Sequence, residues 1–100
     1  MLNHYVFIKY AKGTSDDHIS EFSRRMLALR NSIPGIEHLE IGHDMLHEAR
    51  SWHLMLIMRF GSVEALRLYQ RHPEHQELMA FNQPHVTEVG AVDFFGNDVA

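Results

Sequence analysis

The chain has 100 residues, of which 45% are hydrophobic and 22% charged, and it contains no cysteine. These values are typical of one globular domain over residues 1–100, with a core at about 3–95. The lack of cysteine excludes disulfides, thiolate nucleophiles and cysteine-ligated metal centres. A formal net charge of -4 argues against nucleic-acid binding, and no apolar run reaches the ~18–20 residues of a membrane span. The N-terminus lacks a signal-peptide pattern, so we expect a cytoplasmic protein.

The first part of the chain predicts a strand, a helix and a second strand. Residues 4–10 are rich in aromatic and β-branched side chains, which favour a strand. A helix-start signal at residues 14–17 precedes apolar residues spaced three and four apart, and Pro34 ends that helix. Residues 36–41 predict a second strand whose two faces are less clearly distinguished, and it ends near Gly42.

The second part predicts a strand, two helices and a last strand. Residues 52–60 are almost continuously apolar and predict a strand buried on both faces. Ser62 can cap a helix that stops before Pro73, and Pro73 suits the first turn of a short new helix. Residues 87–95 predict the last strand. The order β-α-β-β-α-β predicts an α+β, ferredoxin-like protomer: a four-stranded antiparallel sheet with its main helices on one face.

The predicted strands are apolar on both faces. Val6 points to the opposite side from Tyr5 and Phe7, and Leu56 to the opposite side from Ile57. An antiparallel sheet with one solvated face should instead alternate apolar and polar residues, and a patch this large needs a cover. We therefore predict a homodimer joined through its sheet faces. The alternative is a ligand pocket on the open face, and both fit together if the dimer leaves space between the sheets.

Short motifs stand in a fixed order along the chain. They are His4-x-Val6-x-Ile8-Lys9, Ile33-Pro34-Gly35, Gly42, Phe60 with Ser62, Tyr69-x-x-His72-Pro73-x-His75 and Val92-Asp93-Phe94. Together, over about residues 3–95, they resemble the stress-responsive dimeric α/β-barrel (Dabb) domain family of the dimeric α+β barrel superfamily. The resemblance implies a ferredoxin-like protomer that forms a barrel-like dimer. Many members of the family have no assigned activity.

The resemblance also implies a set of catalytic residues. Olivetolic acid cyclase, a plant relative, closes a polyketide chain without a cofactor and uses a Tyr–His pair. Tyr69 and His75 match that pair, and His4 matches a histidine of the cyclase pocket. A further cyclase histidine on the third strand falls at Leu54, whereas His53 lies one residue away and should face the other side of the sheet.

Two interpretations of the motif around His75 remain open. Pro73 places His75 in the first turn of a helix, where the helix dipole disfavours imidazolium, so we expect a neutral base able to act beside a carbonyl. Tyr69 can orient it or bind an enolate oxygen. Alternatively, His72 and His75 are structural caps bonded to backbone. A tunnel lined by His4, Tyr69 and His75 would favour the first interpretation, and a closed helix junction the second.

Further residues are predicted to contact a ligand, and no metal or cofactor is expected. The predicted substrate-binding residues are Trp52, His53, His72, Phe7 and Met79. Trp52 has two possible positions, over the mouth of a pocket or in the dimer interface, since aromatic residues serve in both. No acidic residue completes a metal site with His72 and His75. A minor alternative, by analogy with haem-degrading monooxygenases of related folds, uses Asn3, Trp52 and His75. We expect His18 to be solvated on the first helix.

These observations favour a small homodimeric domain that binds a small apolar or aromatic carbonyl compound between sheet and helices. Any chemistry would be proton transfer of a cyclase, isomerase or lyase type. The alternative is a non-enzymatic stress-response or assembly protein, in which the dimer itself is the function. The expected partners are a second copy of the chain and a small hydrophobic ligand, with no nucleic acid and no membrane.

Overall fold

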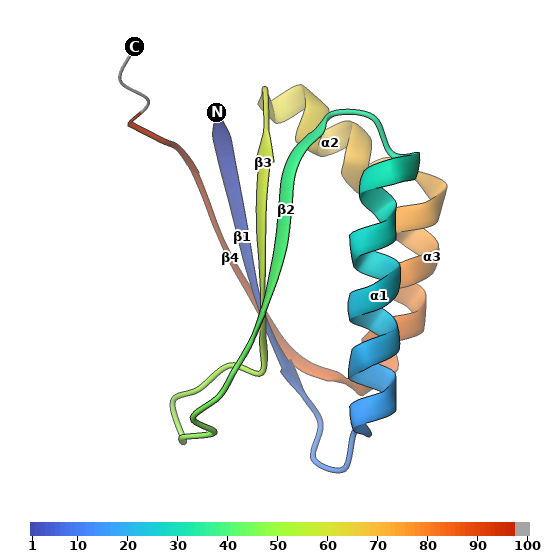
Figure 1. The fold of residues 1–100 in the computed structure, drawn as a ribbon, viewed down its shortest axis with the longest axis vertical. Coiled ribbons are helices and arrows are strands. Elements are labelled where there is room, and N and C mark those ends of the chain that lie inside the picture. Colours follow the sequence, from blue (N-terminus) through green and yellow to red (C-terminus); the bar gives the residue numbers. More distant parts are fainter. Residues whose placement is uncertain (98–100) are drawn as a thin grey trace.

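The sheet has four antiparallel strands, and all the helices lie on one side of it (Figure 1). The computed structural model describes residues 1–97. The elements are β1 (Leu2–Tyr10), α1 (Asp16–Ser32), β2 (Ile36–His43), β3 (Leu54–Phe60), α2 (Val63–Arg71), α3 (Pro73–Asn82), a single 3₁₀ turn (Gln83–His85) and β4 (Val86–Phe95). The strand order β2-β3-β1-β4 is that of the ferredoxin-like fold, which confirms the predicted fold class.

The helix ends lie where the sequence predicted them. Ser15 and Ser62 cap α1 and α2 by accepting hydrogen bonds from the backbone N–H groups of His18 and Ala65. His72 ends α2 and also caps α3, because its Nδ1 accepts a hydrogen bond from the N–H of Glu74. Pro73, in the first turn after this cap, starts α3 as a new helix, so the helical region between β3 and β4 consists of two segments.

The core lies between the helices and one face of the sheet. Alternate residues of β3, from Leu54 to Phe60, are buried against this layer, and Phe22 and Met26 of α1 are fully buried opposite them. The strand predicted over residues 52–60 begins only at Leu54, so the predicted start was two residues too early. Trp52 lies before the strand, and its indole contacts Phe7 on the face of the sheet without helices.

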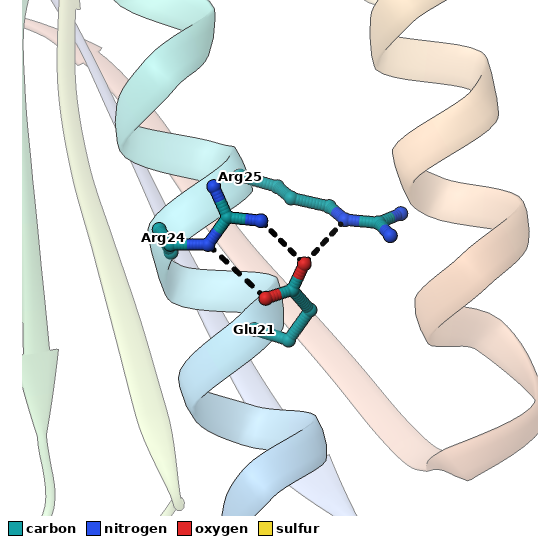
Figure 2. A network of polar contacts seen from close by, with 3 residues as sticks. All are labelled: Glu21, Arg24 and Arg25. Atoms are coloured by element: carbon teal, nitrogen blue, oxygen red, sulfur yellow. Dashed lines mark hydrogen bonds and ion pairs between the residues drawn. The ribbon is translucent and has the colours of Figure 1, made fainter.

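A polar network on α1 also links this helix to α3. Glu21 accepts hydrogen bonds from Arg24 and Arg25, as Figure 2 shows. The Arg25 guanidinium lies 4.4 Å from the ring centre of Phe81 on α3. Hydrogen bonds first from Arg24 and then from Arg25 lower the pKa of the Glu21 carboxyl to about 2. The network therefore orients Arg25 across the surface between the two helices.

The prediction that His18 is solvated was wrong. Its imidazole is half-buried, stacks on Phe81 at 4.6 Å between ring centres and lies 3.9 Å from the ring of His85. The His18 Nε2 lies 3.0 Å from the Oδ1 of Asn82. Helical periodicity alone placed His18 on α1 but could not show that the end of α3 and the turn after it close over this side chain.

The face without helices is apolar, as the strand parity predicted. Tyr5 of β1 pairs with Ile57 of β3 and with Val92 of β4, so all three share this face. By the same register Phe7, Met55 and Phe94 lie on it as well. Val92 is 51% and Phe94 42% exposed. Within the single chain, a group of large apolar side chains is therefore left partly uncovered.

Candidate functional site

A cavity of about 260 Å³ lies between α3 and the helix-side face of β1 and β4. It is lined by His4, Val6, Ile8, Leu56, Tyr69, His75, Met79, Asn82, Gln83, Val86 and Val89. Most of these side chains are apolar, and the polar ones come from β1 and from α2, α3 and the turn after it. The volume is just below the ~300–1,000 Å³ of drug-sized ligand sites, so the cavity suits a small molecule.

His75 lies in the first turn of α3, and its ring orientation is fixed by the backbone. Its Nδ1 donates a hydrogen bond to the carbonyl oxygen of Gln70, 3.1 Å away. In the neutral ring, Nε2 is then the acceptor, and among residues 1–97 Nε2 has no hydrogen-bond partner. Burial is the main cause that lowers the pKa of His75; the hydrogen bond to Gln70 opposes it, and electrostatic interaction with His4 and His72 adds to the lowering. The expected neutral state thus rests on burial more than on the helix dipole that suggested it.

Tyr69 packs against His75 without a hydrogen bond between them in the described chain. The two rings meet edge to face, with their centres 4.4 Å apart. The Tyr69 hydroxyl donates to the sulfur of Met26 at 3.9 Å, which is a weak contact, and burial raises the pKa of this hydroxyl. Tyr69 is therefore a neutral side chain that holds the position of the His75 ring.

His4 is held by a carboxylate on the neighbouring strand. His4 of β1 is buried and pairs in register with Asp93 of β4, and its Nδ1 forms a short hydrogen bond with the Asp93 carboxylate. This contact leaves Nε2 as the second ring nitrogen available to a ligand. The sequence motif contained Asp93, but no role followed from it, because the contact joins residues 89 positions apart and depends on strand register.

The structure brings together four of the predicted site residues: His4, Tyr69, His75 and Met79 all line the cavity. Phe7 and Trp52 instead lie on the helix-free face, with ring centres 5.8 Å apart. The Lys9 amine lies 4.9 Å from the Trp52 ring centre.

The two remaining predicted contacts, His53 and His72, have structural partners outside the cavity. The His53 Nδ1 accepts a hydrogen bond from the N–H of Tyr10, and His72 caps α3. The haem analogy also fails on geometry, because Asn3 and Trp52 lie across the sheet from His75.

Asn82 lines the cavity but was not among the predicted site residues. It is buried and lies at the opposite end of α3 from His75. Positions 75, 79 and 82 follow the helical spacing of one face, and this spacing was the available signal. Gln83, Val86 and Val89 could not be assigned from sequence, because their positions depend on the turn into β4.

The described residues do not form a group of three or more histidine, aspartate and glutamate side chains able to hold a metal ion. In the same part of the chain, the helices are too short or too polar to cross a membrane.

Comparisons with known proteins identify the family. No protein with curated annotation matches the sequence. A protein of Arabidopsis thaliana has the same fold with a TM-score of 0.86 and 22% identity, covering 100% of this chain and 99% of that one. A hydroxynitrile lyase from Passiflora edulis has a TM-score of 0.85 and 18% sequence identity, and the match covers 99% of this chain and 95% of the lyase. A dimeric ferredoxin-like protein of Thermobifida fusca has a TM-score of 0.83 and 20% sequence identity, and the match covers 93% of this chain and 88% of that protein. The model of the stress-responsive A/B barrel domain matches residues 2–95, and the chain therefore belongs to this family.

Proposed function

We propose that the cavity binds a small, largely apolar carbonyl compound and that His75 takes a proton from it without a cofactor. The observation that carries this proposal is a mostly apolar cavity containing a neutral histidine whose Nδ1 is bonded to backbone. Such a bond fixes the tautomer and leaves Nε2 to act as a base. The backbone bond expected for a purely structural histidine is thus compatible with a catalytic one.

The proposed step moves one proton. Nε2 of His75 accepts a proton from the carbon beside the carbonyl group. The C–H electron pair forms a carbon–carbon double bond as the π pair of the carbonyl group moves to its oxygen, which gives an enolate. The Gln70 carbonyl keeps its hydrogen bond to Nδ1 throughout, which stabilises the imidazolium that forms. Return of the proton from His75 to another carbon completes an isomerisation. Attack of the enolate carbon on a second carbonyl group of the same molecule, followed by return of the proton to the alkoxide that forms, completes a cyclisation.

His4 is proposed as the second proton-transfer group. It faces the same cavity, and Asp93 holds its ring through Nδ1. In its protonated form, Nε2 can donate to the oxygen on which negative charge develops. A hydroxynitrile lyase has the same fold, and lyase chemistry on a hydroxynitrile also requires a positioned base.

We also propose a homodimer joined through the helix-free face. The partly exposed apolar side chains of that face support it, because a second copy of the same face can cover them. Solved structures with the same fold are described as dimeric. The cavity lies on the other face of the sheet, so it remains available in such a dimer.

A non-enzymatic role in stress response or assembly is the second candidate. The observation in its favour is that half of the His-Pro-x-His motif is structural, since His72 caps α3. In this alternative the cavity has no substrate, and the dimer itself is the functional unit.

Proton exchange in heavy water tests the first proposal without knowledge of the product. Small methyl ketones and β-keto compounds are incubated with the protein in D₂O, and loss of the α-proton signal is followed by NMR. We expect faster exchange with the wild-type protein than in buffer, together with shifts of the His4 and His75 ring signals. If no compound of the panel exchanges faster or shifts these signals, the proposal is refuted and the assembly role is favoured.

A further inference from the structure

Asn82 lies at the end of the cavity remote from His75, and two donors occupy its side-chain oxygen. The Tyr10 hydroxyl donates to Oδ1 at 2.8 Å, and His18 Nε2 lies 3.0 Å from the same atom. Asn82 is only 3% exposed. Burial raises the pKa of Tyr10 to about 12, so its hydroxyl remains a donor at neutral pH. Both contacts therefore hold one half of the amide group in place.

The contacts with Tyr10 and His18 also fix the orientation of the Asn82 amide group. With Oδ1 toward Tyr10, the buried hydroxyl proton and the His18 N–H both have an acceptor. With the amide reversed, the Tyr10 hydroxyl proton would have no acceptor, which is costly in a buried position. The amide nitrogen Nδ2 carries two further protons, and among residues 1–97 it has no hydrogen-bond partner.

The polar groups of the cavity are separated by apolar residues. His75 and Asn82 are seven positions apart on α3, which corresponds to ~10 Å along the helix axis. Met79 of α3 and Val6 and Ile8 of β1 line the cavity between its two ends. A molecule that fills the cavity therefore meets histidines at one end, an apolar middle and an amide donor at the other.

We propose that Asn82 binds a second hydrogen-bond acceptor of the ligand through Nδ2. The ligand class is then an elongated apolar molecule with a reacting carbonyl near His75 and a keto or other acceptor oxygen roughly 10 Å away. This inference rests on the proposed function and deepens it, because it assigns the determinant of substrate choice. Asn82 acts in specificity, since it lies away from the reacting carbon.

A pair of linear methyl ketones tests the inference. Both span the cavity, but only one carries a second keto group at its far end. We expect the diketone to bind the wild-type protein about tenfold more tightly, the value of one hydrogen bond of ~1.4 kcal/mol. The Asn82 side-chain N–H signals should shift with the diketone and stay in place with the monoketone. Titration by NMR gives both results in one experiment.

Two variants locate the donor. Asn82→Asp retains an oxygen for Tyr10 and His18 but replaces the N–H donors with a second acceptor, so the affinity ratio should fall to about one. Gln83→Leu removes the other amide that lines the cavity and should retain the ratio. Circular dichroism verifies that both variants are folded.

Each result has a distinct meaning. Equal binding of both ketones by the wild-type protein, or a ratio that survives in Asn82→Asp, overturns the role of Asn82 and leaves the proposed function standing. A ratio lost only in Gln83→Leu assigns the donor to Gln83 and also overturns it. If neither ketone binds, the proposed function fails, and the inference falls with it.

Discussion

On the face covered by helices, β1 directs His4, Val6 and Ile8 to the cavity, whereas on the opposite face it directs Tyr5 and Phe7 away from it. On the helix side, the polar side chains of His4, His75 and Asn82 are each held by a hydrogen-bond partner, as Asp93 holds His4. On the other side, large apolar groups remain partly exposed. Because successive side chains of a strand point to opposite faces, one sheet can bind a ligand on its helix side and a second copy of the chain on its other side.

The largest expected effect is the loss of proton transfer in His75→Ala. A general base contributes ~10²–10⁴-fold, so this variant should lose that much of any exchange or turnover found with the wild-type protein. Its state of association should not change, because His75 lies on the helix side of the sheet. Exchange in D₂O and light scattering measure the two properties separately. Undiminished exchange would end the assignment of His75 as the base.

Two matched variants show whether the loss is specific to His75. Tyr69→Phe removes a hydroxyl whose contact is the Met26 sulfur and keeps the ring that packs on His75, so it should cost at most about tenfold. His53→Ala removes a histidine that does not line the cavity and should leave exchange nearly unchanged.

The second prediction concerns the opposite face. Phe7→Asp or Ile57→Asp places a charge among the apolar side chains of the helix-free face and should weaken association by at least ~100-fold, since a buried unpaired charge costs several kcal/mol. Proton exchange per chain should be reduced much less. Leu68→Asp, at a 54% exposed position on α2, is the control and should still associate. A wild-type protein that is monomeric at micromolar concentration would rule out the proposed dimer.

The comparison of the two faces also shows what the sequence could predict. Strand parity separated Tyr5 and Phe7 from Val6 correctly, because the side-chain period of a strand is a local property. Helix starts at Ser15 and Ser62 were equally local. The sequence did not separate Trp52 from His75, because Trp52 precedes β3 and strand parity does not fix the face on which it lies.

Long-range contacts account for the rest of the site. Asp93 reaches His4 only through the pairing of β1 with β4, and no local pattern encodes that register. Asn82 received no role from sequence because its two donors come from β1 and α1. The identity of residues that touch the cavity was therefore partly predictable, whereas the partners that orient them were not.

The third prediction concerns the pH dependence of proton exchange, which we expect to follow the protonation of His75 in the cavity. Burial lowers the pKa of His75, so its titration midpoint by NMR should lie below the ordinary 6.5, and exchange should already be maximal near neutral pH. The unfolded chain binds this proton more readily, so the contribution of His75 to stability decreases as pH falls below 6.5. A midpoint well above 7 would remove the electrostatic basis of the base assignment.

The smallest expected effect comes from Glu21→Gln, which affects neither face of the sheet. Glu21 is solvent-exposed on α1, and solvent screening makes such ion pairs weak, so we expect a decrease of only roughly 1–4 °C in Tm at neutral pH. Because the arginines lower the Glu21 pKa from 4.5 to about 2, the stabilisation is fully present above 4.5 and is lost as pH falls through about 2. The difference in Tm between variant and wild type should therefore disappear in strong acid. A large loss of stability, or any loss of association or exchange, would mean that the contact of Arg25 with Phe81 transmits an effect from the helix surface to the cavity.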